Sequence, residues 1–297
     1  KYGKDDERIV VLDADLSGST KSGIFGKACP ERFLNVGIAE SNMVGMAAGL
    51  ASVGKIPFVN TFTVFLTTLG LCAARAFGSY SQLPIKFAGA YGGMSDAFDG
   101  PSHHALEDIA VMRSLANVQV FVPCDAVQTE WLVKYAIDTP KPIYLRLSRD
   151  KFKDLYTSET EFAPGKGIVV REGTDITVIA CGLMVGNAID AAEELAKEGI
   201  SVRVVDMFSI KPIDEALIVR CAKETGAIVS AEEHNIYGGL GSAVAEVLTK
   251  HGCGVTQGFV GVNDCHGECG PYKKLLAKYG LDANAIANKV RETLAKK

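Results

Sequence analysis

The chain has 297 residues, of which 47% are hydrophobic and 22% are charged, and its formal net charge is −4. This composition is typical of a globular protein long enough for two domains, each with its own core. The slightly acidic balance, without a local basic stripe, gives no reason to expect nucleic acid or an anionic membrane as a partner.

No segment predicts membrane crossing, export or metal binding. The longest nearly uncharged stretch, residues 61–74, contains several threonines and is too short to span a bilayer. Residues 1–8 lack the apolar region of a signal peptide, and the eight cysteines are scattered. The Cys cluster at residues 265–269 lacks a second ligand pair at zinc-like spacing. We therefore expect a cytoplasmic protein without its own metal site.

The first half of the chain predicts a parallel sheet covered by helices on both faces. Short continuous apolar runs alternate with helical segments, which is typical of such sheets. The predicted strands are Ile9–Leu12, Phe58–Asn60, Ile85–Gly89, Gln119–Pro123 and Ile143–Leu147.

A polar stretch after Arg149 ends in Pro164-Gly165-Lys166-Gly167 and predicts a linker at residues 156–167. A second unit then begins, with strands predicted at Ile176–Ala180, Val202–Val205 and Ala227–Ser230 and helices at 187–198, 242–250 and around 286–294. We therefore predict an α/β fold of two doubly wound domains with mainly parallel sheets, residues 1–155 and 168–297. Ligands of such folds bind at the carboxyl ends of the strands.

One carboxylate, Glu40, stands between a predicted apolar strand and a helix of small residues. The sequence runs Asn-Val-Gly-Ile-Ala-Glu to Glu40, and residues 44–51 are small or apolar. An apolar setting is expected to raise the pKa of Glu40 and make it a candidate proton-transfer group. The alternative is an acid that only interacts with the positive end of the helix dipole.

Three further loops follow predicted strands and carry polar or aromatic residues without an evident packing role. They are Asp15–Ser19, Thr61–Phe65 and Asp96–His104. Each member alone has a simpler interpretation as a core phenylalanine, a turn residue or a surface group. Together with Glu40, they predict a site at one rim of the first sheet.

These motifs resemble those of transketolases. The resemblance rests on Glu40 in its context, on the Thr-Phe-x-x-Phe and Asp-Gly-Pro-Ser-His sequences, and on Leu-Ser-Arg ending at Arg149. It continues in the second half with Glu-Glu-His-Asn at residues 232–235 and Gly-Pro at 270–271. It covers nearly the whole chain and implies a thiamine-diphosphate pyrimidine-binding domain followed by a transketolase C-terminal domain.

The resemblance covers only half of a transketolase. The family's first domain binds the cofactor's diphosphate and its metal with a Gly-Asp-Gly sequence, which does not occur here. The resemblance therefore implies one subunit of a split transketolase. Its partner subunit, the N-terminal half, would hold the diphosphate of thiamine diphosphate and Mg²⁺. We expect a heterotetramer with two copies of each chain, and a homodimer for the isolated chain.

The resemblance also implies contacts with the cofactor. Glu40 matches the glutamate that hydrogen-bonds the aminopyrimidine and favours the tautomer that removes the thiazolium proton. Phe62 and Phe65 match the aromatic wall against which the pyrimidine packs. Asp15 matches a residue close to the cofactor.

Four residues match contacts with a sugar phosphate. Ser19 and Arg149 match phosphate-binding residues, and a planar guanidinium suits two phosphate oxygens. Asp99 and His103 match groups that bind substrate hydroxyls, and His103 is also placed for proton transfer. Glu40 and His103 are therefore the predicted catalytic residues.

Two positions depart from the family pattern. Thr68 stands where many transketolases place a third aromatic residue beside the pyrimidine, so the predicted pocket is looser there. Tyr91 stands where they place a histidine near the sugar hydroxyls. We include Thr68 among the predicted cofactor contacts and Tyr91 among the predicted substrate contacts.

The implied reaction is transfer of a two-carbon ketol unit from a ketose phosphate to an aldose phosphate, as in the pentose phosphate pathway. Two related enzymes are alternatives: the β subunit of a 2-oxo acid dehydrogenase E1 component, and a deoxyxylulose phosphate synthase. A third alternative is a non-catalytic assembly subunit that retains the fold. Glu40 and His103 favour an enzyme, because a scaffold has no use for both.

Overall fold

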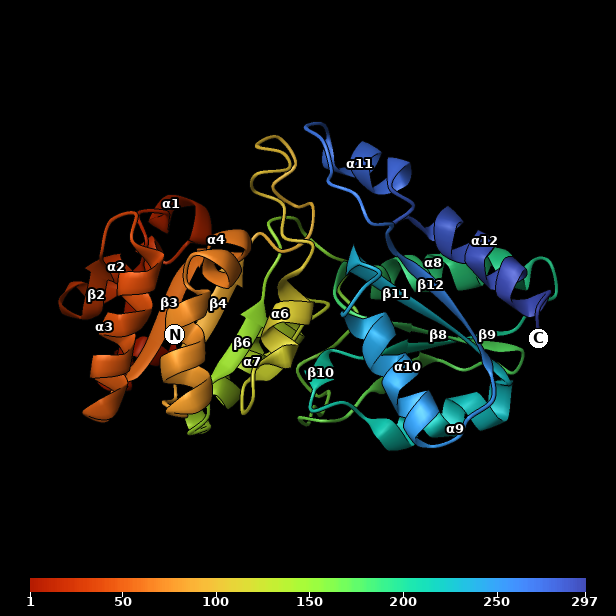
Figure 1. Ribbon diagram of the computed structural model, residues 1–297, viewed down its shortest axis with the longest axis horizontal. Coiled ribbons are helices and arrows are strands. Elements are labelled where there is room, and N and C mark those ends of the chain that lie inside the picture. Colours follow the sequence, from red (N-terminus) through yellow and green to blue (C-terminus); the bar gives the residue numbers. More distant parts are fainter.

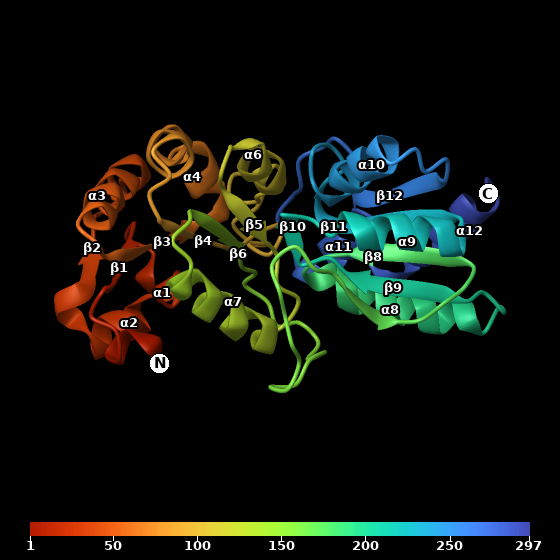
Figure 2. The same cartoon turned by 90° about the horizontal axis from the view of Figure 1, so that it is seen from below.

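The computed structural model describes all 297 residues and forms two lobes that lie side by side, each a sheet between helices (Figures 1 and 2). The first sheet has seven strands in the order β10-β5-β6-β4-β3-β1-β2, and the second has five in the order β12-β11-β8-β9-β7. All neighbouring strands are parallel except the pairs β10–β5 and β7–β9. The predicted α/β fold with mainly parallel sheets is confirmed.

The strands are β1 Ile9–Asp13, β2 Phe33–Asn35, β3 Ile56–Phe62, β4 Lys86–Ala90, β5 Gln119–Phe121, β6 Ile143–Arg146, β7 Ile168–Arg171, β8 Ile176–Ala180, β9 Val202–Asp206, β10 Ser209–Lys211, β11 Ala227–Asn235 and β12 Thr256–Val262. The helices of the first lobe are η1 Tyr2–Lys4, α1 Ser17–Thr20, α2 Gly23–Ala28, η2 Pro30–Arg32, α3 Glu40–Ser52, α4 Thr63–Thr68, α5 Leu71–Ala73, η3 Ala74–Tyr80, α6 Asp108–Ser114 and α7 Ala126–Asp138. Those of the second lobe are α8 Leu183–Ala196, α9 Glu215–Thr225, α10 Leu240–Lys250, α11 Tyr272–Lys278 and α12 Ala283–Leu294.

The helices cover both faces of each sheet. In the first lobe α3, α4 and α6 lie on one face and α1, α2 and α7 on the other (Figure 2). In the second lobe α9 packs against α10, and α8 packs against α12. Aspartates cap three helices: Asp125, Asp214 and Asp282 each accept a hydrogen bond from a backbone N–H in the first turn of the helix that follows.

Two predicted boundaries differ from the structure. The strand before Glu40 ends at Asn35, so a short connection separates it from α3. The helix predicted at 187–198 is α8, which begins at Leu183 and ends at Ala196. Its first turn, residues 183–186, has no polar face that would show a helical period in the sequence, and Met184 and Val185 are buried.

The two lobes share buried apolar contacts and one sheet. β10 follows β9 along the chain but pairs with β5 at the edge of the first sheet, with Ser209 opposite Phe121. A cluster of 35 buried apolar side chains contains Leu12 from the first lobe and Val205 and Leu240 from the second. The expectation of a separate core for each domain is therefore wrong, because this cluster continues across the boundary.

The segment from the end of β6 to β7 contains no helix or strand but is fastened to both lobes. Asp125 Oδ2 accepts hydrogen bonds from the backbone N–H groups of Leu155 and Tyr156, at 3.0 and 2.8 Å. The Tyr156 hydroxyl donates to Asp206 Oδ2 at the end of β9, at 2.8 Å. The domain limits 1–155 and 168–297 stay a prediction. None of the helices combines the length and apolarity that crossing a membrane requires.

Asp206 gives the fold a pH dependence that can be measured. Burial raises its pKa from the ordinary value of 3.8 to about 6. The folded chain therefore binds a proton more readily than the unfolded chain, and the free energy of unfolding falls as the pH rises from about 4 to about 6. Asp206→Asn does not titrate. Over this pH range, we expect the free energy of unfolding of the wild type, measured with urea, to fall by about 3 kcal/mol relative to that of the variant.

The control for this experiment is Asp190→Asn, because Asp190 is a half-exposed aspartate on α8. Its unfolding free energy should follow the wild type at each pH. A constant difference between wild type and Asp206→Asn across the whole range would contradict the assignment.

Candidate functional site

The predicted site residues lie at the carboxyl ends of neighbouring parallel strands of the first sheet. β6, β4, β3 and β1 are consecutive in that sheet, with Phe62 opposite Ala90 and Asp13 opposite Asn60. The residues that follow these strand ends therefore share one rim. This is the rim at which ligands of doubly wound folds bind.

Four rings form an aromatic cluster at this rim, consisting of Phe62, Phe65, Tyr91 and His103. Phe62, buried at the end of β3, stacks on Tyr91 with ring centroids 4.5 Å apart and on Phe65 of α4 at 5.9 Å. The His103 ring lies edge-on to Phe65 at 5.2 Å. The structure thus brings together residues predicted for the cofactor and residues predicted for the sugar. Such packed rings form a firm apolar wall.

Tyr91 also supports the predicted phosphate-binding residue. The Arg149 guanidinium carbon lies 5.2 Å from the centroid of the Tyr91 ring, and Arg149 Nη1 lies 3.0 Å from Asp96 Oδ1. Asp96 is fully buried, and burial together with the nearby Asp99 carboxylate raises its pKa, while Arg149 and His103 oppose this shift. Stacking and ion pairing therefore hold a half-exposed cation at the rim.

Glu40 is the first residue of α3 and is 4% exposed. Its carboxylate has one hydrogen-bond partner within the chain, the Thr61 hydroxyl, which donates to Oε1 over a long 3.5 Å. Since a carboxylate can accept about four hydrogen bonds, most of its accepting capacity is free. Thr61 and Phe62 are the last two residues of β3, so the carboxylate lies at the same rim as the aromatic cluster. This combination fits an aminopyrimidine, which offers N–H donors and an apolar ring.

The loop after β1 is organised by Asp13, a residue that the sequence analysis did not select. Its buried carboxylate accepts hydrogen bonds from Leu16 N at 2.6 Å, Thr20 Oγ1 at 2.8 Å and Ser22 Oγ at 2.7 Å. The sequence signal for this role was the position of Asp13 at the end of β1, shortly before the hydroxyl residues Thr20 and Ser22. Asp13 therefore shapes the loop that carries the predicted residues Asp15 and Ser19.

The two predicted residues of this loop differ in their contacts. The Asp15 carboxylate is exposed and accepts a hydrogen bond from Asn35 Nδ2 at 2.9 Å, so it faces β2. The backbone oxygen of Ser19 accepts a 3.5 Å hydrogen bond from the Tyr91 hydroxyl. Ser19 thus adjoins the aromatic cluster, whereas Asp15 lies toward Asn35.

Asp99 and His103 lie on one loop that the second lobe touches. His103 Nδ1 lies 2.9 Å from the Ser102 hydroxyl, and Asp99 is exposed. Gly100 between them has φ +79°, and a Cβ there would lie 2.3 Å from Cys269 Sγ of the second lobe. Only glycine fits this turn. Thr68 is exposed at the end of α4, and its hydroxyl donates to the Val64 carbonyl oxygen at 2.6 Å.

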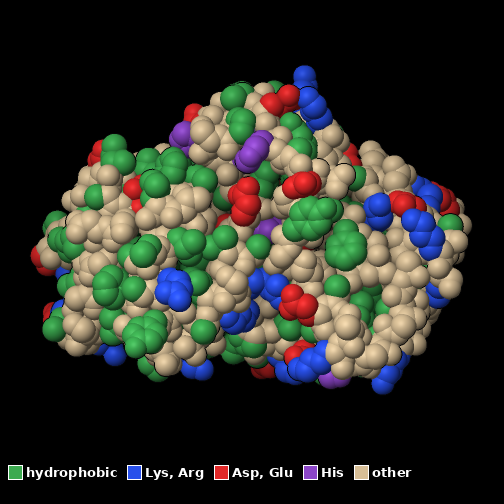
Figure 3. All heavy atoms as spheres, viewed as in Figure 1, with side chains coloured by type: hydrophobic (Ala, Val, Ile, Leu, Met, Phe, Trp, Pro, Cys, Tyr) green, Lys and Arg blue, Asp and Glu red, His purple; other side chains and the backbone are tan.

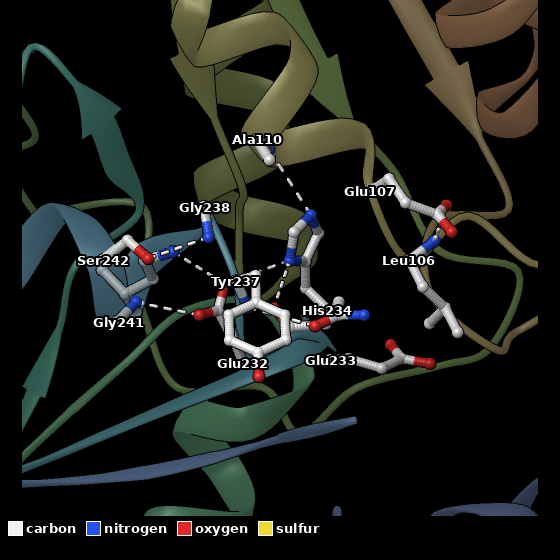
Figure 4. Close-up of polar contacts among 12 residues, drawn as sticks. Leu106, Glu107, Ala110, Glu232, Glu233, His234, Tyr237, Gly238, Gly241 and Ser242 are labelled. Carbon is white, nitrogen blue, oxygen red and sulfur yellow. Dashed lines mark hydrogen bonds and ion pairs between the residues drawn. The ribbon is translucent and has the colours of Figure 1, made fainter. Parts of the chain in front are cut away.

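The Glu-Glu-His-Asn motif at residues 232–235 forms the end of β11 (Figure 4). Glu232 accepts hydrogen bonds from Leu240 N and Gly241 N at 2.7 and 2.8 Å, and so caps α10. Burial raises the pKa of Glu233 to about 7, although Arg146 and hydrogen bonds from Met94 N and the Tyr272 hydroxyl oppose the shift. The motif lies at the boundary between the lobes rather than in the aromatic cluster.

No group of three or more His, Cys, Asp or Glu side chains is arranged to hold a metal ion. At the rim of the first sheet the site offers a carboxylate, an aromatic cluster and a cation.

Comparison with known proteins defines the class. The family model for the transketolase pyrimidine-binding domain matches residues 1–154, and that for the transketolase C-terminal domain matches residues 165–286. The fold is thus that of the pyrimidine-binding and C-terminal domains of a thiamine-diphosphate-dependent enzyme. The chain belongs to the transketolase family.

Relatives of similar length are named as a section or as subunits of transketolases. A transketolase C-terminal section from Methanocaldococcus jannaschii is 41% identical over all of this chain and 93% of that protein. The 6-deoxy-6-sulfo-D-fructose transketolase subunit SqwH of a Clostridium species is 39% identical over all of this chain and 92% of that protein. The alternatives of an E1 β subunit or a deoxyxylulose phosphate synthase are therefore not favoured.

A solved structure agrees with this assignment. A split-gene transketolase, described as an inactive β4 tetramer, is 48% identical, with a TM-score of 0.90 over 99% of this chain and 94% of that chain. This chain is accordingly a subunit of a split transketolase. The roles of individual site residues stay predictions.

The role of Asp13 can be tested by comparison with Asp15. Asp13→Ala leaves the partly buried Leu16 N–H and the Thr20 and Ser22 hydroxyls without their acceptor, so we expect urea unfolding to show a loss of about 2 kcal/mol. Asp15→Asn removes an exposed charge and tolerates the positive φ of this position. It should change the unfolding free energy by less than about 0.5 kcal/mol. Equal losses in both variants would show that Asp13 does not organise the loop.

Proposed function

We propose that this subunit binds the pyrimidine half of thiamine diphosphate and a sugar phosphate, and that the holoenzyme transfers a two-carbon ketol unit from a ketose phosphate to an aldose phosphate. The observation that carries the proposal is the Glu40 carboxylate, buried at the rim that bears the aromatic cluster, with most of its accepting capacity free. When bound, thiamine diphosphate supplies the carbon nucleophile for the ketose carbonyl.

The residues of this chain have distinct tasks in the proposal. Glu40 accepts a hydrogen bond from the aminopyrimidine and favours the tautomer that removes the thiazolium proton. Phe62 and Phe65 pack against the ring. His103 and Asp99 bind the sugar hydroxyls, and His103 exchanges a proton with a substrate oxygen. Asp15 and Thr68 border the cofactor.

The terminal anion of the sugar is assigned to Arg149, with Ser19 and Tyr91 beside it. Arg149 keeps a planar guanidinium half-exposed while Asp96 and Tyr91 hold it in place. The Clostridium relative is named for a sulfonated sugar, so a terminal anion is a feature that different substrates of such subunits share. We assign a phosphate to this position.

An exposed apolar surface marks where the partner subunit is proposed to bind. Large hydrophobic side chains are exposed on or beside α3, α4 and η3: Ile38, Met46, Leu69, Phe77 and Tyr80. Figure 3 shows hydrophobic side chains over this part of the first lobe. The surface adjoins Glu40 and Phe65, so a partner on it would complete the active site, and the small residues of α3 permit close approach.

The remaining assignments extend the same proposal. The partner subunit, an N-terminal half, holds the diphosphate and Mg²⁺, and two copies of each chain form a heterotetramer. A structure described as an inactive β4 tetramer for a 48% identical relative supports the need for a partner. We place the enzyme in the cytoplasm and in pentose phosphate metabolism.

A calorimetric titration tests the split site. Thiamine diphosphate with Mg²⁺ should show no measurable binding to this chain alone, because the Gly-Asp-Gly sequence with which the family binds the diphosphate and metal does not occur in it. Binding should be tight once the copurified partner subunit is present. Tight binding to the isolated chain would contradict the proposal, since it would require a diphosphate site within these residues.

The role of Glu40 is tested by Glu40→Gln in the reconstituted complex. We expect kcat for ketol transfer to fall about a thousandfold, because an amide cannot exchange the proton. Thiamine diphosphate should still bind, because the apolar wall is intact. Glu31→Gln, an exposed glutamate outside the site, is the matched control. Unchanged turnover in Glu40→Gln would favour a non-catalytic assembly subunit.

A further inference from the structure

The loop between β4 and α6, residues 91–107, is closed at its base and held by the second lobe. Gly93 and Ala105 exchange two backbone hydrogen bonds, of 3.0 and 2.9 Å. Asn235 N at the end of β11 donates to the Leu106 carbonyl oxygen at 2.8 Å. Figure 1 shows the loop projecting beside the segment that precedes α11. The loop carries three of the predicted substrate residues, Tyr91, Asp99 and His103, and therefore needs a defined position.

Glu233 of the second lobe makes a side-chain contact to the base of this loop. Its Oε1 accepts hydrogen bonds from Met94 N at 2.7 Å and from the Tyr272 hydroxyl at 2.9 Å. The side chain is 3% exposed. Gly93 has φ +69°, and a Cβ there would lie 2.2 Å from Glu233 Cδ. The carboxylate therefore packs directly on the loop backbone, where no side chain fits.

The neighbours of Glu233 hold it in this orientation. Arg146 Nη2 donates to the Glu233 carbonyl oxygen at 2.8 Å and fixes the strand. Glu232 points to the start of α10, and His234 Nε2 accepts a 3.4 Å hydrogen bond from Ala110 N (Figure 4). Because successive strand residues point to opposite faces, Glu233 is directed away from both and toward the loop.

A second contact from the same lobe reaches the tip of the loop. Gly270 N donates to the Ala97 carbonyl oxygen at 2.9 Å, and Cys269 Sγ packs against Gly100. Tyr272, which holds the Glu233 carboxylate, follows two residues after Gly270. The segment before α11 and the end of β11 thus act on the loop as one unit.

We propose that Glu233 is a positioning residue for ketol transfer: it fixes the loop that presents Asp99 and His103 to the sugar, although it belongs to the other lobe. This inference rests on the proposed function, because those two residues are assigned to the substrate only there. Through the hydrogen bond from the Met94 amide to Glu233, the C-terminal domain would contribute to sugar binding by holding the base of the loop.

Hydrogen exchange of the full chain tests the contact without any activity measurement. In Glu233→Ala the Met94 amide loses its acceptor, so amides of residues 94–104 should exchange at least about tenfold faster. Glu233→Gln retains an oxygen at the Oε1 position and should keep the loop protected. Glu232→Gln, on the same strand, weakens the cap of α10 and should leave loop exchange unchanged.

Kinetics of the reconstituted complex separate positioning from a general loss of structure. With fructose 6-phosphate as the donor, Glu233→Ala should raise KM about tenfold. The affinity for thiamine diphosphate should stay within twofold, because Glu40, Phe62 and Phe65 lie on other elements. Glu233→Gln should restore KM, and Glu232→Gln should lower thermal stability without changing KM.

Three results would overturn the inference: wild-type loop exchange in Glu233→Ala, equal damage by Glu233→Gln and Glu233→Ala, or a parallel loss of affinity for cofactor and sugar. Failure of the proposed function has a different signature. In that case the wild-type complex shows no ketol transfer, while the exchange comparison still decides whether Glu233 holds the loop.

Discussion

A buried guanidinium, that of Arg146 at the end of β6, joins the parts on which the site depends. It pairs with Asp108 of α6 through Nε at 2.7 Å and donates to the backbone oxygens of Ala105 and Glu233. The Tyr144 hydroxyl donates to the same Asp108 carboxylate at 2.6 Å. Removing one partner of such a pair leaves an uncompensated buried charge, which is far more costly than the loss of a surface pair.

The two lobes therefore contribute to the site in different ways. The first lobe carries the proposed binding groups, because the parallel strands β2, β3 and β6 end at one rim, at or after which Glu40, Phe62 and Arg149 lie. The second lobe supplies no group to the aromatic cluster. It holds the 91–107 loop from outside through Glu233 and the segment before α11. In our proposal the C-terminal domain of this chain therefore supports the binding rim.

The local sequence pattern was sufficient to predict those helices and strands whose buried positions recur with the period of the element. The apolar run Ile176–Ala180 is a strand with the predicted bounds, and Glu40 begins a helix as predicted. The pattern could not reveal Ser209–Lys211 as a strand of the first sheet, because its pairing partner is distant in sequence. For the same reason, the motif containing Glu233 was recognised, while its contact with Met94 became visible only in three dimensions.

The placement of β10 also bears on how the chain is made. During synthesis the first sheet can assemble from β1 to β6 while β5 still exposes an unpaired edge, which is the kind of edge that recruits other chains. That edge is capped only after Lys211 has left the ribosome. The nascent first lobe therefore stays open to misassembly until much of the second lobe has been translated, and its final closure is a late event in biogenesis.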